Sequence, residues 1–392
     1  MSSIEKPHSR NKYFLSFFII LFFISSCSSI SSLKFWDNNE IDIDEPRPLE
    51  AIIIDKKINI QWDSSFSGNN SLGNFIPGFT SNSIFFADNN GNVRSIDPIS
   101  GNAKWEKKLS TLSSGVASGF GIVVVADIDG NVIALNQDDG SMLWKENVKG
   151  EVLSPAAIDT KLVIVKTGSG ELLALDKING QLVWSYRSKL PSLTIRGSSS
   201  PVIDGDLVFS SFDNGRLGVF ELNSGFPLWD GAISYTKGSS ELENIIDSDS
   251  NPVIDGGYVY TTNYQGNLNL FDIAQKRSVW QSPTSSFYSP LLTRGLIVLV
   301  ESDSLLRSFV TKTLKESWIS EEYRNRNLSN PVSFSGYVVV GDFEGYIHII
   351  DALNGRTVSR KKISKKPIKK IVSRSKSFYV IDEAFNLYSL SI

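Results

Sequence analysis

Residues 167–184, TGSGELLALDKINGQLVW, contain the pattern from which the fold can be inferred. It places an alternating apolar segment between two glycine-containing turns, and then a second apolar segment that ends in tryptophan. This pattern predicts two antiparallel strands, because glycine suits the turn positions that need a positive φ. The pattern recurs in residues 88–105, 127–144, 212–229, 263–280 and 342–359, the last of which has Ser359 in the tryptophan place. A further copy, residues 302–318, has Ser304 at the first glycine.

Tryptophan recurs along the chain with a period close to 40 residues. The series is Trp62, Trp105, Trp144, Trp184, Trp229, Trp280 and Trp318, with spacings of 38 to 51 residues. The units also contain a Pro-containing segment, such as SPAAI (154–158), followed by an apolar segment, such as KLVIVKT (161–167). Four short strands in a repeat of this length are typical of a β-propeller blade. Because equivalent residues of successive blades cannot all line one site, we expect the tryptophans to pack between blades.

The two ends of the repeat region predict how the ring closes. Residues 367–392 supply three strands of a last blade, and KINIQWDSS (57–65) supplies a fourth strand far away in the sequence. Pairing these segments closes a ring and removes its exposed sheet edges. Residues 55–392, shared among eight blades, give about 42 residues per blade. The sequence therefore predicts one all-β domain over residues 55–392, an eight-bladed β-propeller with four-stranded antiparallel blades.

The N-terminus has the features of a targeting segment. A basic stretch precedes an apolar run over residues 13–24, which is shorter than the roughly 20 residues that span a bilayer. The following Ile-Ser-Ser-Cys, ending at Cys27, resembles the lipobox of bacterial lipoproteins. This resemblance implies a signal peptide over residues 1–26 and lipidation of Cys27. It also implies sorting to the outer membrane, facing the periplasm, because Ser28 replaces the aspartate of the alternative signal. A plain secretory signal and an uncleaved anchor are the alternatives.

Composition limits the remaining functions. Residues 27–54 are Ser-rich, then acidic, and predict a flexible tether before the propeller. The 39 basic and 42 acidic residues leave a net charge of −3, without the basic excess that suits nucleic acid. One cysteine excludes a disulfide framework and a zinc site built on several thiolates. Beyond Cys27 the only histidine is His348, which leaves little room for histidine catalysis.

The repeat motif D-x-x-G-x-x-x-A-L-D-x-x-x-G-x-x-x-W resembles that of pyrroloquinoline quinone (PQQ) enzymes and their non-enzymatic relatives. Behind a lipobox, and with segments 190–205 and 238–257, the chain resembles the BamB family of outer-membrane assembly factors. This resemblance implies a non-catalytic scaffold of the β-barrel assembly machinery, with no cofactor. It implies docking on the POTRA domains of the central barrel protein, BamA, beside other lipoproteins of the machinery. Departures from the repeat, at Lys276, Ser304, Ser359 and Phe385, fall at structural positions.

Two connections between blades are unusually long. The distance from the tryptophan of one unit to the first proline of the next is 17 residues after Trp184 and 23 after Trp229. It is 10 to 13 residues after Trp144, Trp280 and Trp318. Such connections emerge on one face of a propeller, and these two are consecutive, so we expect them to be neighbours that form a binding surface. The residues predicted to bind the partner are Leu193, Ile195, Arg196, Asp247 and Asp249. The alternative is that Arg196 only pairs with the two aspartates within the chain.

Two other functions remain as alternatives. A PQQ-dependent periplasmic dehydrogenase needs a calcium site and a carboxylate base, yet the repeated aspartates (Asp88, Asp127, Asp342 and Asp382) stand at equivalent turn positions and predict turns rather than one site. We therefore predict no catalytic, cofactor-binding or metal-binding residues. A propeller that binds a cell-envelope polymer would need exposed aromatic residues at one channel mouth. The basic stretch 360–376 predicts a solvated blade edge, with anionic lipid or lipopolysaccharide as the alternative. Binding of nascent outer-membrane proteins along strand edges is left open.

Overall fold

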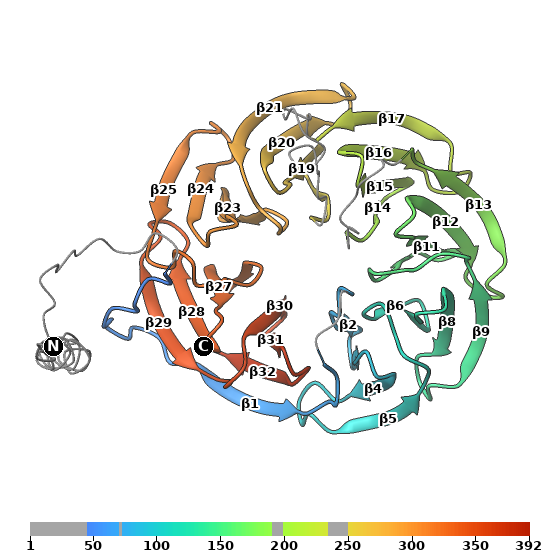
Figure 1. The fold of residues 1–392 in the computed structure, drawn as a ribbon, viewed down its shortest axis with the longest axis horizontal. Helices are drawn as coiled ribbons and strands as arrows, with labels where there is room; N and C mark the ends of the chain where they lie inside the picture. The colour runs from blue at the N-terminus through green and yellow to red at the C-terminus, as the bar shows by residue number, and fades with distance from the viewer. Residues whose placement is uncertain (1–44, 70–72, 190–198, 234–249) are drawn as a thin grey trace, which may run out of the picture. The chain divides into compact units, whose positions relative to one another are not determined.

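Eight four-stranded antiparallel sheets make up the part of the chain that the computed structural model describes, residues 45–69, 73–189, 199–233 and 250–392. The sheets stand around a ring like the blades of a propeller, and the described residues contain no helix (Figure 1). Within each blade we call the strands A to D, from the centre of the ring to its rim. The predicted all-β, eight-bladed propeller is confirmed, and Pro46–Ile392 forms one compact unit.

The strands fall into four sets of eight, each in the order of blades 1 to 8. The A strands are β2 (Gly78–Phe79), β6 (Ala117–Gly119), β10 (Ala157–Ile158), β14 (Val202–Asp204), β18 (Val253–Asp255), β22 (Leu291–Thr293), β26 (Val332–Phe334) and β30 (Ile368–Arg374). The B strands are β3 (Ile84–Ala87), β7 (Ile122–Ala126), β11 (Leu162–Lys166), β15 (Leu207–Phe212), β19 (Tyr258–Thr261), β23 (Leu296–Val300), β27 (Tyr337–Gly341) and β31 (Ser377–Asp382). The C strands are β4 (Asn92–Ile96), β8 (Asn131–Asn136), β12 (Glu171–Asp176), β16 (Arg216–Glu221), β20 (Gly266–Asp272), β24 (Leu306–Val310), β28 (Tyr346–Asp351) and β32 (Leu387–Ser391). The D strands are β5 (Ala103–Lys108), β9 (Met142–Asn147), β13 (Leu182–Arg187), β17 (Pro227–Ala232), β21 (Arg277–Thr284), β25 (Glu316–Ser320), β29 (Thr357–Lys362) and β1 (Asn59–Ser64).

The hydrophobic core lies between neighbouring blades. Strands such as β11 are buried over their whole length, which explains their nearly continuous apolar sequence. The D strands, such as β13, alternate between exposed and buried residues because they form the rim of the ring. One core cluster joins β11, β12 and Trp184 of blade 3 to β15 and β16 of blade 4. Each blade is therefore stabilised mainly by its neighbours.

The tryptophans pack between blades, as predicted. Trp144 of blade 2 lies against Gly180 in the C–D turn of blade 3, where an added Cβ would come within 2.6 Å of the indole ring. Its Nε1 donates a hydrogen bond to the backbone oxygen of Lys177 in the same turn, at 2.8 Å. Trp184 repeats this arrangement against Gly225 of blade 4. Glycine is required at these turns both for its positive φ (75° at Gly180) and for the close approach of the ring.

The departures from the repeat leave the blades intact. Lys276, Ser304 and Phe385 adopt the positive φ of the glycines they replace, with values of 56°, 67° and 62°. Such a conformation is unfavourable for a residue other than glycine. The hydrogen bonds between the flanking strands must therefore hold these residues in place. The turns therefore persist where the glycine has been lost.

Ring closure follows the predicted pairing. Strand β1 pairs antiparallel with β32, from Asn59 opposite Ser391 to Ser64 opposite Leu387. The last blade thus takes its D strand from the beginning of the propeller and its other strands from the end, β30 to β32. Figure 1 shows β1 completing the ring between β29 and β5.

The chain before β1 lies along the rim of blade 7. Asp55 donates its backbone N–H to Val358 O in β29 at 2.8 Å, and Arg360 of the same strand donates to Glu50 O at 2.8 Å. Further back, Arg47 donates its backbone N–H to Arg324 O at 3.0 Å. Residues 46–54, which composition assigned to the tether, thus include Arg47 and Glu50, whose backbone groups are bonded to the propeller. Residue composition does not reveal these contacts. We call residues 46–58 the strap.

Candidate partner-binding face

The two long connections start and end beside one another on the propeller. The first runs from β13 to β14 and the second from β17 to β18. Near their C-terminal ends, the backbone N–H of Ser200 donates to Oδ1 of Asn251 at 2.7 Å, so the two connections are joined directly. The five residues predicted to bind the partner (Leu193, Ile195, Arg196, Asp247 and Asp249) lie outside the described residues, as does Cys27.

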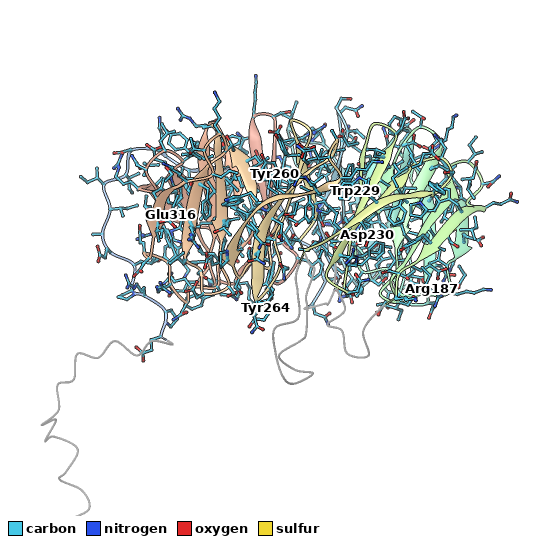
Figure 2. The ribbon with its side chains drawn as sticks, turned by 90° about the horizontal axis from the view of Figure 1, so that it is seen from above. Arg187, Trp229, Asp230, Tyr260, Tyr264 and Glu316 are labelled. Carbon is cyan, nitrogen blue, oxygen red and sulfur yellow. The ribbon has the colours of Figure 1, made fainter. Side chains whose placement is uncertain are left out.

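The B–C turns support these D-to-A connections on the same face of the ring. Asn214, in the B–C turn of blade 4, donates from Nδ2 to Ser188 Oγ at 2.9 Å and to Lys189 O at 3.0 Å, where the first long connection begins. In the edge-on view of Figure 2, Arg187 at the end of β13 and Tyr264 in the B–C turn of blade 5 lie toward one face. We call this side of the propeller the connection face.

The repeated aspartates form turns, as the sequence predicted. Asp127 Oδ1 accepts hydrogen bonds from the backbone N–H groups of Asp129 at 3.0 Å and Asn131 at 2.9 Å. Burial would raise the pKa of Asp127, but hydrogen bonds from Asn131 and Ser110 outweigh it and the pKa is lowered. The equivalent carboxylates also accept the amide N–H four residues further on, at Asp88, Asp342 and Asp382. Each aspartate therefore serves its own turn, and within the described ranges no group of three or more potential ligands could hold a metal ion.

A buried polar cluster links the strap to blade 7, and sequence reasoning did not anticipate it. His348 Nε2 lies 3.1 Å from Asp342 Oδ2, while Arg360 Nε donates to His348 Nδ1 at 3.1 Å. Because Nδ1 accepts, the proton of this neutral imidazole lies on Nε2 and is donated to Asp342. Arg326 also donates to Asp342, at 2.7 Å, and reaches the strap at Arg47 O, at 3.0 Å.

Burial determines the charge states of this cluster. The His348 side chain is fully buried, and burial lowers its pKa more than Asp342 raises it. Burial alone would raise the pKa of Asp342, but hydrogen bonds from His348 and Arg326 hold it below its usual value. The cluster therefore contains a neutral histidine between a carboxylate and two guanidinium groups. Its groups are used in internal contacts, so it holds the strap in place.

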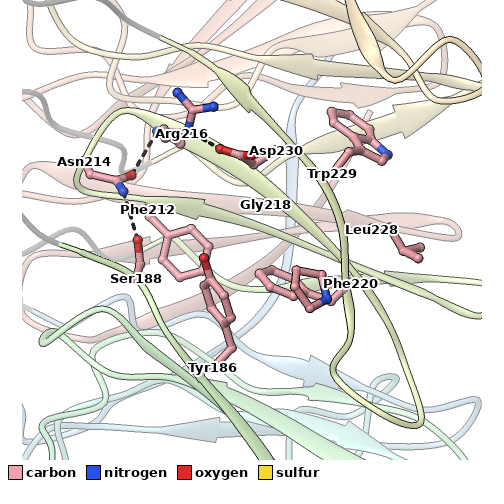
Figure 3. Close-up of a pocket in the computed structure, with 11 residues that line it drawn as sticks. Tyr186, Ser188, Phe212, Asn214, Arg216, Gly218, Phe220, Leu228, Trp229 and Asp230 are labelled. Atoms are coloured by element: carbon pink, nitrogen blue, oxygen red, sulfur yellow. Dashed lines mark hydrogen bonds and ion pairs between the residues drawn. The ribbon is translucent and has the colours of Figure 1, made fainter.

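A cavity of about 310 Å³ opens between blades 3 and 4 (Figure 3). Its lining comes from the end of β13, the B–C turn of blade 4, and strands β16 and β17. The residues are Tyr186, Ser188, Phe212, Asn214, Arg216, Gly218, Phe220, Pro227, Leu228, Trp229 and Asp230. Figure 2 places Trp229 and Asp230 on the outer wall of the ring, whereas Ser188 and Asn214 belong to the connection face. The cavity therefore extends from the outer wall to the beginning of the first long connection.

Glycine at position 218 shapes this cavity. The third residue after the B–C turn faces the preceding blade, and in the other seven blades it carries a side chain: Arg94, Ile133, Leu173, Asn269, Arg307, His348 and Tyr388. In blade 4 the rings of Phe220 and Phe212 lie over Gly218, and an added Cβ would come within 2.8 and 2.9 Å of them. The two rings thus occupy the place that a side chain at position 218 would take, and they form the inner wall of the cavity. A glycine at this one place in the repeat is the sequence signal that could have indicated the cavity.

A smaller cavity of about 190 Å³ lies among the A strands on the same face. Phe287, which lines it, is 37% exposed and stacks on Tyr264 with ring centroids 4.6 Å apart. Lys370 covers the ring of Tyr288, at 5.5 Å from its centroid. Asn251 of the second long connection lines the same cavity, so this aromatic pair belongs to the connection face.

Comparison with known proteins adds three findings. A family model described as outer membrane protein assembly factor BamB matches residues 89–320. Outer membrane protein assembly factor BamB of Moranella endobia is 32% identical over 319 residues, which cover 77% of this chain and 82% of that protein. The Escherichia coli protein of the same name is 28% identical and is matched over 83% of this chain and 86% of its own length.

Solved structures show the same fold. The crystal structure of BamB from Moraxella catarrhalis superposes with a TM-score of 0.77 at 24% identity, covering 84% of this chain and all of that one. A europium-containing methanol dehydrogenase superposes with a TM-score of 0.69 at 13% identity, which reflects the shared propeller alone. Within the described ranges, no helix is long and apolar enough to cross a bilayer.

Proposed function

Because this chain belongs to the BamB family of outer membrane protein assembly factors, we propose that it is a non-catalytic scaffold subunit of the β-barrel assembly machinery. In this role it docks on the periplasmic POTRA domains of the central barrel protein, BamA, and assists insertion of outer-membrane proteins. The partner-binding residues are Leu193, Ile195, Arg196, Asp247 and Asp249 on the two long connections.

The observation that carries this proposal is the hydrogen bond between Ser200 and Asn251. It joins the two long connections at their C-terminal ends, so residues far apart in the sequence can contribute to one surface. Leucine, isoleucine and arginine on the first connection provide apolar contacts beside a guanidinium, and arginine is enriched at the centres of protein interfaces. The use of the repeated aspartates as turn formers supports binding rather than catalysis.

Lipidation of Cys27 completes the proposal. Acyl chains on this residue anchor the protein to the outer membrane on its periplasmic side, since several chains bind a bilayer firmly where one binds only marginally. The residues between Cys27 and the strap then act as the tether.

Substitution of Arg196 by glutamate tests the partner-binding residues. We expect binding to the purified POTRA domains to weaken by about 2–5 kcal/mol, the cost of removing one partner of a buried interfacial charge pair. Asp247→Lys and Asp249→Lys should act in the same direction. The melting temperature should stay unchanged, because residues outside the blade cores contribute little stability. Calorimetric titration and thermal unfolding measure the two quantities.

A matched control separates this surface from general electrostatics. Lys366 is an exposed residue of the connection between blades 7 and 8, and Lys366→Glu reverses one charge as Arg196→Glu does. The control should bind normally. Normal binding by Arg196→Glu together with lost binding by Lys366→Glu would refute the proposed interface.

A further inference from the structure

We propose that the cavity between blades 3 and 4 receives an aromatic side chain of the protein that docks on the two long connections. This inference rests on the proposed function and extends it from the connections to a described, partly apolar cavity on the adjoining wall of the ring. The occupant is a phenylalanine, tyrosine or tryptophan presented by the partner.

The first argument is the chemistry of the inner lining. Tyr186 of β13 and Phe220 of β16 have ring centroids 4.6 Å apart with an interplanar angle of 56°, and Phe212 lies within 6.2 Å of both. Figure 3 shows these three rings grouped on one side of the cavity. Tilted and edge-to-face contacts with such rings favour an aromatic occupant over an aliphatic one of similar size.

The second argument is the polar side of the same cavity. Arg216 and Asp230 form an ion pair, and Asn214 is bonded to Ser188. In Figure 3, Arg216 and Asp230 are drawn above the three rings, and Ser188 is drawn beside Phe212. The ring of an aromatic occupant can therefore contact the three aromatic rings. Its polar groups, such as a tyrosine hydroxyl or the backbone of the partner, can bond to the polar lining residues.

The third argument is position. The cavity begins where the first long connection begins, because Asn214 lines it and also bonds the backbone oxygen of Lys189. Its volume of about 310 Å³ is at the lower end of the range for ligand pockets, about 300–1,000 Å³. In protein interfaces the strongest contacts are aromatic side chains held in pockets of this kind. A partner seated on the connections can therefore place a side chain here without a second docking surface.

Thiol protection tests the occupancy of the cavity directly. Leu228 lines the cavity and is 37% exposed; Leu143 stands at the same place in blade 2, one residue before its tryptophan, and is 46% exposed. We would introduce Leu228→Cys or Leu143→Cys into the full chain and follow maleimide labelling of the peptide that contains the new cysteine. Saturating POTRA domains should slow labelling at position 228 by about tenfold or more and leave position 143 within about twofold.

Other results overturn the inference. Equal labelling at position 228 with and without a bound partner shows an unoccupied cavity. If position 228 is labelled much more slowly than position 143 before any partner is added, the chain itself, or a second copy of it, fills the cavity.

An affinity measurement distinguishes failure of this inference from failure of the proposed function. Leu228→Lys should weaken binding to the POTRA domains by roughly tenfold, whereas Leu143→Lys should change it by less than about twofold. If Arg196→Glu abolishes binding while Leu228→Lys binds normally, the cavity plays no part and the proposed function stands. If the unmodified chain does not bind the POTRA domains at all, both proposals fail together.

Discussion

Five tryptophans pack against a glycine in the C–D turn of the next blade, at Gly101, Gly140, Gly180, Gly225 and Gly355. The same contact explains why one tryptophan is missing. Trp318 of blade 6 lies against Gly355 in the C–D turn of blade 7, as Trp144 does against Gly180. Blade 7 has Ser359 at this place because blade 8 has no C–D turn, since the ends of the propeller chain meet there. The Oγ of Ser359 instead donates to the backbone oxygen of Lys56 in the strap, at 2.7 Å.

Replacement of His348 by glutamine should flatten the pH dependence of stability between pH 7 and 5. Burial lowers the pKa of His348 in the folded chain, so below pH 6.5 the unfolded chain takes up a proton that the folded chain does not. The contribution of His348 to the free energy of unfolding is therefore complete above the pKa of the unfolded chain. It decreases as the pH falls below that value, by at most about 1.4 kcal/mol per pH unit. Glutamine can donate to Asp342 and accept from Arg360 without titrating.

Urea unfolding at several pH values measures this effect. Burial also raises the pKa of Glu301, so this residue contributes to the pH dependence of the free energy of unfolding. Its contribution is the same in both proteins and cancels in the comparison. Identical slopes for the unmodified chain and His348→Gln would show that the histidine does not contribute.

At the scale of elements, the strap and β1 cover the edges of two different blades. Strand β1 supplies the fourth strand of blade 8 and so removes the free edge of β32. The strap covers the edge of β29, where Val358 is only 3% exposed, whereas Val183 at the same place in blade 3 is 50% exposed. The two segments are adjacent in the sequence but stabilise different blades.

Stepwise N-terminal truncation should separate these two contributions. Removal of residues 1–45 should leave unfolding unchanged, because the strap and β1 remain. Removal of residues 1–57 should cost about 1–3 kcal/mol, the sum of a few backbone and charged hydrogen bonds to blade 7. Removal of residues 1–65 should cause aggregation or loss of cooperative unfolding, because β32 becomes a free edge. Calorimetry and light scattering measure these outcomes, and a cooperative, soluble chain without residues 1–65 would contradict this account of closure.

At the scale of the whole propeller, the strap lies against blade 7, across the ring from blade 3, after which the first long connection begins. The strap begins at Arg47, which pairs with Glu321 in the D-to-A connection after blade 6. The long connections follow blades 3 and 4, which lie four and three blades from blade 7, against which the strap lies. Figure 1 shows β29 and β13 on opposite sides of the centre. The described N-terminal segment, the strap, therefore lies against blade 7 and not against blades 3 and 4.

Substitution of Cys27 by serine should release the protein from the membrane without changing its affinity for the POTRA domains. The unacylated chain should move to the aqueous phase of a detergent phase separation, since the acyl chains supply the membrane affinity. Binding should persist because the proposed partner-binding residues lie on the two long connections and do not include Cys27. Retention of the Cys27→Ser protein in the detergent phase would contradict lipidation at this residue.

The repeat, the number of blades and the way the ring closes could all be predicted from the sequence. The repeat depends on local rules, namely glycine at turns, alternating apolar residues in strands and a tryptophan at the end of most D strands, and each rule can be read within about twenty residues. Ring closure follows from counting the strands at the two ends of the repeat region. The sequence also showed which connections are long. Arg196, which the family resemblance indicates as a binding residue, lies in the first of them.

Three features of the molecule could be seen only in the tertiary structure. The strap, the buried contact between His348 and Arg360, and the cavity over Gly218 depend on how one blade faces the next, or on a segment reaching a strand some 300 residues away. Composition assigned residues 46–54 to a tether because their backbone hydrogen bonds to blade 7 have no local sequence signal. Gly218 is visible in the sequence, but its consequence is not, because the rings that lie over it adopt that position only when blades 3 and 4 pack together.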